Sequence, residues 1–135
     1  MNITYNNVLK MLKEIYRNNF MNFTGRIGKN DYWNFMVGFI ILSAILNGII
    51  SFMYGGFFLW NIWMGACEMV LNMLLFIPAL GVNLRRCHDL GHDNMYFVKK
   101  MIICCIGWYQ YFTEMAKEGD ADANKYGPVP ESICK

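Results

Sequence analysis

The chain contains one long stretch with almost no charge. Between Tyr32 and Leu84 the only formally charged side chain is Glu68. A soluble domain of 135 residues must cover its core with polar side chains, and so long an uncharged stretch leaves too few of them. The composition agrees, because 56% of the residues are hydrophobic and 16% are charged, a smaller charged share than in an ordinary soluble domain. We therefore expect an all-α membrane protein, since a helix satisfies its own backbone hydrogen bonds in lipid.

Two membrane-spanning helices are predicted within this stretch. The first covers residues 32–54, which include eleven Leu, Ile, Val or Phe residues, and the Tyr32-Trp33 pair at its start suits the membrane interface. Gly55-Gly56 then predicts a tight return, and the second helix covers residues 57–84. This second helix is long for a hydrocarbon core about 30 Å thick, so we expect it to tilt or to project beyond the lipid.

A third span is expected over residues 95–113. Only the part from Met101 to Phe112 is cleanly apolar, which is short for a span. The prediction therefore requires Lys99 and Lys100 to extend toward the lipid headgroups from the first turns. The alternative is two spans followed by an interfacial helix.

The segment before the first span is predicted to form an amphipathic helix over residues 6–20. Its apolar side chains recur three and four residues apart, and its charged side chains occupy the opposite face. Next to a membrane span, such a helix is expected to lie in the interface with its apolar face toward lipid. We therefore divide the chain into an amphipathic segment (1–30), a transmembrane domain (31–113) and a polar tail (114–135).

The placement of lysine and arginine predicts an orientation in the membrane. The segment up to Lys29 holds five of these residues and the region from Arg85 to Lys100 holds four, whereas the Gly55-Gly56 turn holds none. The positive-inside rule then places the N-terminus and residues 85–93 in the cytoplasm. With three spans the polar tail lies outside the cell, and with two it stays inside.

Residues 85–93, which we call the hinge, hold the densest cluster of ionisable groups and are expected to connect the second and third spans. In a structural interpretation, Asp89 pairs with an arginine, His88 bonds to neighbouring backbone ends and Gly91 ends the helix. In a second interpretation, Arg85 and Arg86 bind anionic lipid headgroups or phosphate at the cytoplasmic interface.

Zinc binding by the hinge is the third interpretation. His88 and His92 are four residues apart, with Asp89 and Asp93 beside them, and this is a possible set of zinc ligands. However, Gly91 interrupts the helix that would align the two imidazoles, and no HExxH motif with its general base is present.

Glu68 is the other residue that requires an explanation. An acidic side chain near the middle of a span disfavours insertion by roughly 2.5–3.5 kcal/mol. Polar and small residues share its helix face, which holds Asn61, Gly65, Glu68 and Asn72. A matching stripe on the first span consists of Ser43, Asn47 and Ser51, with Gly48 adjacent. Such stripes join helices in lipid. Glu68 is then a protonated packing residue, part of a pathway for a proton, ion or polar solute, or an oligomer contact.

Three motifs together resemble a known family. They are Phe23-Thr24-Gly25-Arg26 followed by Tyr32-Trp33, then Arg85-Arg86-Cys87-His88-Asp89-Leu90-Gly91, and finally Asn124-Lys125-Tyr126-Gly127-Pro128-Val129-Pro130. In this order they are similar to the signature of the domain of unknown function 805 family, the YhaH-type small inner-membrane proteins of bacteria. The resemblance implies a multi-pass plasma-membrane protein and supplies no established activity.

The sequence favours a structural, interaction or envelope-associated role. We expect no enzyme, cofactor or resident metal, because no nucleophile elbow, CxxC pair or Gly-rich phosphate loop is present. We expect no nucleic-acid partner, because no Lys/Arg stripe is interleaved with aromatics. The expected partners are the lipid bilayer, with anionic headgroups at Arg85 and Arg86, and a second copy or another membrane protein. The alternative function is a small transporter or channel component that uses Glu68. The candidate residues for function or structure are Arg26, Tyr32, Trp33, Glu68, Arg85, Arg86, His88, Asp89, Gly91, Asn124 and Gly127.

Overall fold

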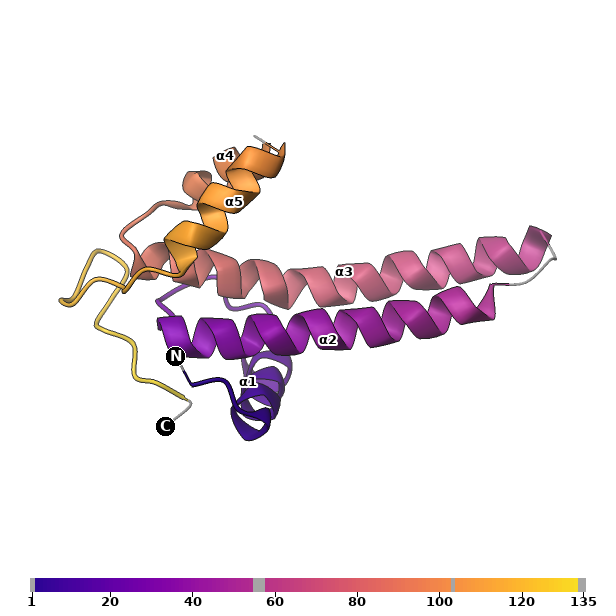
Figure 1. Ribbon diagram of the computed structural model, residues 1–135, viewed down its shortest axis with the longest axis horizontal. Coiled ribbons are helices and arrows are strands. Elements are labelled where there is room, and N and C mark those ends of the chain that lie inside the picture. The colour runs from indigo at the N-terminus through magenta and orange to yellow at the C-terminus, as the bar shows by residue number, and fades with distance from the viewer. Residues whose placement is uncertain (1, 55–57, 103, 134–135) are drawn as a thin grey trace.

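Two long helices lie side by side along the length of the molecule (Figure 1). Over residues 2–54, 58–102 and 104–133, which the structure describes, this computed structural model contains five α-helices and no β-strand. The long pair consists of α2, Lys29–Met53, and α3, Phe58–Asp89. The predicted Gly55-Gly56 turn between them lies outside the described residues.

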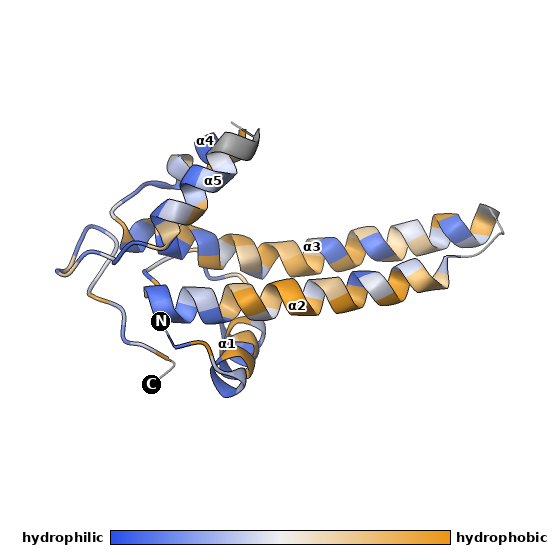
Figure 2. Ribbon diagram, viewed as in Figure 1, coloured by the Kyte–Doolittle hydropathy of each residue, from blue (hydrophilic) through white to orange (hydrophobic). Residues whose placement is uncertain are grey.

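Both long helices have the length and hydropathy needed to cross a membrane. The 25 residues of α2 and the 32 residues of α3 correspond to about 38 Å and about 48 Å at 1.5 Å per residue. Each therefore exceeds a hydrocarbon core about 30 Å thick. Figure 2 shows hydrophobic residues predominating along the pair and hydrophilic residues gathered at the end where α3 finishes. The prediction of two apolar helices of spanning length is confirmed.

The molecule has two parts that differ in where their apolar side chains point. We call residues 37–54 and 58–76 the stem, and the described residues outside this range the cap. All the buried residues of the hydrophobic core cluster lie in the cap. In the stem, large apolar side chains are exposed, with Ile40 at 58%, Ile45 at 55% and Phe52 at 92%. A continuous exposed apolar surface of this kind suits lipid, because soluble monomers rarely carry one.

The α3 helix extends beyond the predicted end of the second span. It continues through the first five hinge residues to Asp89, so only residues 90–93 connect it to the next helix. The helix continues past Leu84 for a physical reason. Arg86 and Asp89 are three residues apart on one helical face and form an ion pair there.

The segment predicted as a third span forms two short helices, α4 (Asn94–Ile102) and α5 (Cys104–Met115). They pack antiparallel, because Lys100 Nζ donates to Gln110 Oε1 at 2.7 Å and the Phe97 ring lies 5.5 Å from that of Tyr111. With 9 and 12 residues, the helices are about 14 Å and about 18 Å long. Neither is long enough to span a bilayer. A third span over 95–113 is therefore not confirmed, and after α5 the tail packs against the end of α3 and the loop before α2.

The N-terminal helix α1, Tyr5–Asn18, turns its apolar face toward protein and not toward lipid. Met11 and Ile15 are fully buried, and α1 packs against α2, where Gly38 leaves room for Val8 and Leu12. The prediction of an amphipathic helix is confirmed in its position and periodicity. The expectation that its apolar stripe faces lipid is wrong, because the start of α2 offers that stripe a protein surface.

We expect Gly38→Leu to lower the free energy of unfolding by about 1–3 kcal/mol, because overpacking a filled contact costs that much. A Cβ atom at Gly38 would already lie 2.8 Å from Val8 Cγ1. Gly48→Leu is the matched control, since nothing lies within 4 Å of a Cβ atom there. Denaturant unfolding in detergent micelles measures both. Equal effects of the two substitutions would contradict the packing of α1 on α2.

Candidate functional site

The centre of the cap is a carboxylate held between two arginines. Arg26 Nε donates to Asp89 Oδ1 at 3.0 Å, and Arg86 Nη1 forms an ion pair with Asp89 Oδ2. All three side chains are buried, with exposed fractions of 6% for Arg26, 0% for Arg86 and 2% for Asp89. Arg26 comes from the loop before α2, whereas Arg86 and Asp89 belong to the last turn of α3. The first and second sequence motifs therefore meet at one ion triad.

The remaining donors of the two arginines bind the backbone of the tail. Arg26 donates to Asp120 O at 2.6 Å and to Asp122 O at 2.8 Å. Arg86 donates to Met115 O at 3.1 Å and to Lys117 O. A buried charge is tolerated when an opposite charge and hydrogen bonds satisfy it. Both guanidinium groups are therefore used to hold the tail against α3.

His88 joins the loop before α2 to the third motif. Its Nδ1 lies 3.0 Å from Gly25 O and its Nε2 lies 2.6 Å from Asn94 Oδ1. The imidazole stacks on the Tyr126 ring with centroids 3.9 Å apart. The backbone carbonyl of His88 accepts from Asn124 Nδ2 at 2.9 Å. These contacts agree with the structural interpretation of His88.

Three glycines in the motifs, Gly25, Gly91 and Gly127, occupy positive-φ positions that favour glycine. Gly91 has φ +73° and ends α3, where His92 N donates to Cys87 O at 2.9 Å and Gly91 N donates to His88 O at 3.1 Å. This is the hydrogen-bond pattern of a Schellman motif. Gly127 has φ +131° and closes the tail turn through two backbone hydrogen bonds with Asn124. The predicted helix stop at Gly91 is confirmed.

A second buried polar network crosses the cap beside the ion triad. Asn83 Oδ1 accepts from Tyr32 OH at 3.0 Å and from Tyr111 OH at 2.7 Å. Asn83 Nδ2 donates to Ala79 O at 2.8 Å. Burial raises the pKa of the Tyr111 phenol above its ordinary value, so this group stays protonated as a donor. The ring of Trp33 packs edge-on against Tyr32 at 5.3 Å, which places both aromatic residues in the cap and not in a lipid-facing belt.

Arg85 and Arg86 do not form a pair of exposed headgroup ligands. The Arg86 side chain is fully buried and bonded to protein, so it does not reach a lipid phosphate. Arg85 is half-buried, and its backbone carbonyl accepts from Ile27 N at 3.3 Å. The interpretation that both arginines bind headgroups is corrected for Arg86, because Asp89 and the tail carbonyls have taken its donors.

The two hinge histidines have separate partners. His92 stacks on Tyr96 with centroids 3.9 Å apart, and its Nε2 lies 3.5 Å from Glu114 Oε1. Hydrogen bonding from Lys117, with a further contribution from His92, lowers the pKa of Glu114. Within the described ranges, no group of three or more His, Cys, Asp or Glu side chains is placed to hold a metal ion.

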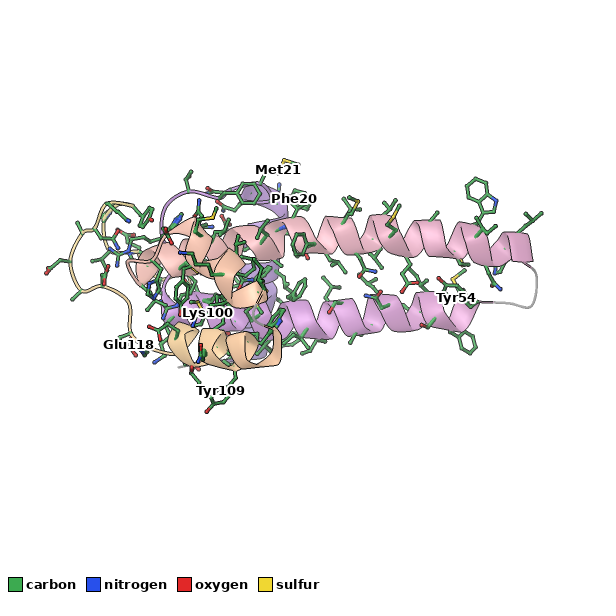
Figure 3. The ribbon with its side chains drawn as sticks, turned by 90° about the horizontal axis from the view of Figure 1, so that it is seen from above. Phe20, Met21, Tyr54, Lys100, Tyr109 and Glu118 are labelled. Carbon is green, nitrogen blue, oxygen red and sulfur yellow. The ribbon has the colours of Figure 1, made fainter. Side chains whose placement is uncertain are left out.

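Glu68 lies in the stem, away from the ion triad. Its Oε2 accepts from Tyr54 OH at 2.7 Å. One turn further along α3, Asn72 Nδ2 donates to Asn47 Oδ1 on α2 at 3.2 Å. The predicted polar stripes on α2 and α3 therefore meet at the Asn47–Asn72 hydrogen bond. Figure 3 shows Tyr54 at the far end of α2 from Glu118 in the tail, so Glu68 and the cap are separate sites.

Three residues that complete the cap, Asp31, Lys10 and Asn83, were not predicted as site residues from the sequence. Asp31 Oδ2 accepts from Ile133 N at 2.7 Å, and Lys10 Nζ donates to Ile133 O at 2.6 Å. Asn83 is the third, at the centre of the tyrosine network. The position of Asn83, a polar residue near the end of an apolar helix, could have marked it as a site residue. Nothing in the sequence pattern indicated that the tail returns to α1 and α2.

Comparisons with known proteins identify relatives without an established activity. The sequence profile of a family described as "Protein of unknown function (DUF805)" matches residues 20–128. The inner membrane protein YhaH of Escherichia coli K12 is 28% identical over 128 residues, covering 91% of this chain and 94% of the relative. The inner membrane protein YhaI of the same strain is 26% identical over 113 residues, covering 84% of this chain and 89% of the relative. No solved structure matches significantly. These relatives and the two apolar helices bear out the prediction of a transmembrane protein.

We expect Asp89→Ala to lower the free energy of unfolding by about 3–5 kcal/mol, because it leaves two buried guanidinium groups without their counter-charge. The tail should also become accessible to proteases. Asp122→Ala is the control, since Asp122 is exposed and meets Arg26 through its backbone carbonyl. Denaturant unfolding in detergent micelles measures the free energy of unfolding, and limited proteolysis measures the accessibility of the tail. A stable, protease-resistant Asp89→Ala protein would show that the triad does not hold the cap together.

Proposed function

The chain belongs to the DUF805 family, and we propose that it is a two-span protein of the bacterial plasma membrane whose cap serves as a structural or interaction module. The stem lies in the bilayer and the cap lies on the cytoplasmic side. The relatives are inner membrane proteins, and the exposed apolar side chains of the stem require a lipid environment.

The Arg26–Asp89–Arg86 triad is the observation that carries this proposal. An enzyme leaves its reactive groups free to meet a substrate. Here Arg26, Arg86 and Asp89 of the family motifs are buried and bonded to one another or to tail carbonyls. His88 is stacked on Tyr126 and bonded through both of its ring nitrogens. Such an arrangement supports a scaffold that presents α1, the α4–α5 pair and the tail in fixed positions.

The proposed topology follows from the charge distribution and the course of the tail. Five Lys or Arg residues precede or begin α2, whereas residues 54–58 hold none, and the positive-inside rule then favours a cytoplasmic cap. The tail bonds to Arg26 and Asp31 at the end of the molecule that holds the N-terminus. Two spans thus keep both termini in the cytoplasm. Three spans would instead place the tail outside the cell.

We expect a fluorescent protein fused to the C-terminus to fluoresce in living bacteria, because that reporter folds in the cytoplasm. Alkaline phosphatase fused after residue 56 should be active, because the turn between α2 and α3 would face the periplasm. The same phosphatase fused to the C-terminus is the matched control and should be inactive. Active phosphatase at the C-terminus would favour the three-span topology.

A second candidate function is transport of a proton, ion or polar solute. Glu68 supports it, because an acid inside a spanning helix often marks such a pathway. Its hydrogen bond from Tyr54 and the neighbouring Asn47–Asn72 contact form a polar seam along the stem. Two helices alone enclose no pathway, so this function requires several copies or another membrane protein around the seam.

Glu68→Gln separates the two functions. Under the scaffold proposal, the variant inserts and folds as the wild type does, because a glutamine oxygen still accepts from Tyr54. Proteoliposomes that contain the wild type or the variant then show no more proton or ion flux than vesicles without protein. Glu118→Gln provides the same chemical change on an exposed cap residue. If the wild type shows a flux that Glu68→Gln abolishes and Glu118→Gln retains, the scaffold proposal is contradicted and a transporter is supported.

A further inference from the structure

A cavity of about 210 Å³ lies between the stem and the α4–α5 pair. This volume is several times the roughly 30 Å³ that one water molecule occupies in the liquid. Its walls come from α2, α3, α4 and α5 and are almost entirely aromatic or aliphatic. The lining residues that matter here are Phe39, Phe76, Ala79, Met101, Trp108 and Phe112. Figure 1 shows the α4–α5 pair leaning away from the long helices.

The chemistry of the cavity excludes a polar solute. The polar side chains that reach it are Asn83 and Tyr111, and these already bond to each other at 2.7 Å. Asn83 also accepts from Tyr32 and donates to Ala79 O. A polar ligand would therefore lose its hydration and gain few hydrogen-bond partners. Protein interiors are close-packed, and an empty apolar space loses dispersion contacts along its whole lining. An apolar occupant suits the cavity.

The position of the cavity indicates which apolar molecule is available. It lies where the cap meets the stem, because the stem residues that line it, Phe39 and Phe76, are close to the cap along α2 and α3. Next to them along α2, Ile40 and Ile41 are exposed at 58% and 53%. At the free end of the α4–α5 pair, Ile102 is exposed at 73%. The cavity thus adjoins the surface that we place in the bilayer, where acyl chains are the abundant apolar groups.

The charge beside the cavity indicates the headgroup. Lys99 and Lys100 occupy the last turn of α4, directly before the lining residue Met101. Lys100 Nζ is held by Gln110 Oε1 at 2.7 Å and lies 5.4 Å from the centre of the Tyr96 ring. The sequence contains no acid from residue 94 to residue 113. The carboxylate of Glu114 on α5 is paired with Lys117 and lies 3.5 Å from His92. The two lysines therefore favour an anionic headgroup at the cytoplasmic surface.

We propose that this cavity binds an anionic phospholipid, with one acyl chain between the stem and the α4–α5 pair and its phosphate at Lys99 and Lys100. The proposal rests on the placement of the stem in the bilayer argued above. It goes further in assigning the α4–α5 pair, which does not span, to the headgroup layer of the cytoplasmic leaflet. There it holds one lipid against α2 and α3.

Quenching of tryptophan fluorescence by brominated acyl chains tests the proposal in vesicles of the full-length protein. One variant retains Trp108, which lines the cavity, and a matched variant retains Trp63 on the outer face of α3; phenylalanine replaces the other tryptophans. The vesicles are phosphatidylcholine with a small fraction of brominated phosphatidylglycerol or, in parallel, of brominated phosphatidylcholine. We expect brominated phosphatidylglycerol to quench Trp108 much more strongly, while the two lipids quench Trp63 equally.

Two substitutions connect the result to the site. The double substitution Lys99→Gln and Lys100→Gln should reduce the preference of Trp108 for phosphatidylglycerol by roughly thirtyfold, because each lysine near an anionic surface contributes about 1 kcal/mol. Ala79→Leu should abolish it by filling the cavity, whereas Ala66→Leu on the exposed face of α3 should leave it unchanged. Equal quenching of Trp108 by both lipids would overturn the proposal and leave the stem in place. Absence of quenching at both Trp108 and Trp63 would overturn the placement of the stem in the bilayer as well.

Discussion

The bridge from Asp89 to Arg26 and Arg86 is the interaction on which the cap depends. Each of these side chains is buried, and each would carry a large desolvation cost without the other two. Their remaining donors hold tail carbonyls from Met115 to Asp122, so the N-terminal loop, the end of α3 and the tail are joined at one point. The space around the carboxylate is full, because a Cβ atom on Gly119 would overlap it. The cap therefore assembles as a unit, and its order depends on charge satisfaction as much as on apolar packing.

The cap and the stem are suited to different environments, water and lipid. Its cap buries Met11, Ile15, Phe35 and other core residues as a soluble domain does, whereas its stem exposes large apolar side chains along both helices. The hydrophobic effect drives the first arrangement, and the second is stable only where lipid replaces water. The boundary falls within α2 and α3, which pass from one environment into the other without a break. This continuity couples the position of the cap to that of the helices in the membrane.

The distribution of polar groups separates structural from functional candidates. The motif residues Arg26, Arg86, His88 and Asp89 are engaged within the cap, and their identities are explained by the contacts they make. Glu68 has a hydrogen bond from Tyr54 but remains an acid in a spanning helix. A cap held rigid by its own charges, next to the bilayer surface, suits a protein that organises lipid or neighbouring proteins.

The sequence alone determined the membrane class, the two long helices, the helix stop at Gly91 and the family, because these depend on local composition, periodicity and short motifs. It also indicated that Asp89 pairs with an arginine, since charges this close to a helix end need partners. Only the tertiary structure showed that Asp89 pairs with both Arg26 and Arg86. It also placed α1 against α2, divided residues 95–113 between two helices and brought the tail back to the end of α3. Those outcomes depend on contacts between residues up to 123 positions apart, as Lys10 and Ile133 are. Hydropathy cannot distinguish an apolar face that meets lipid from one that meets protein, because both present the same side chains.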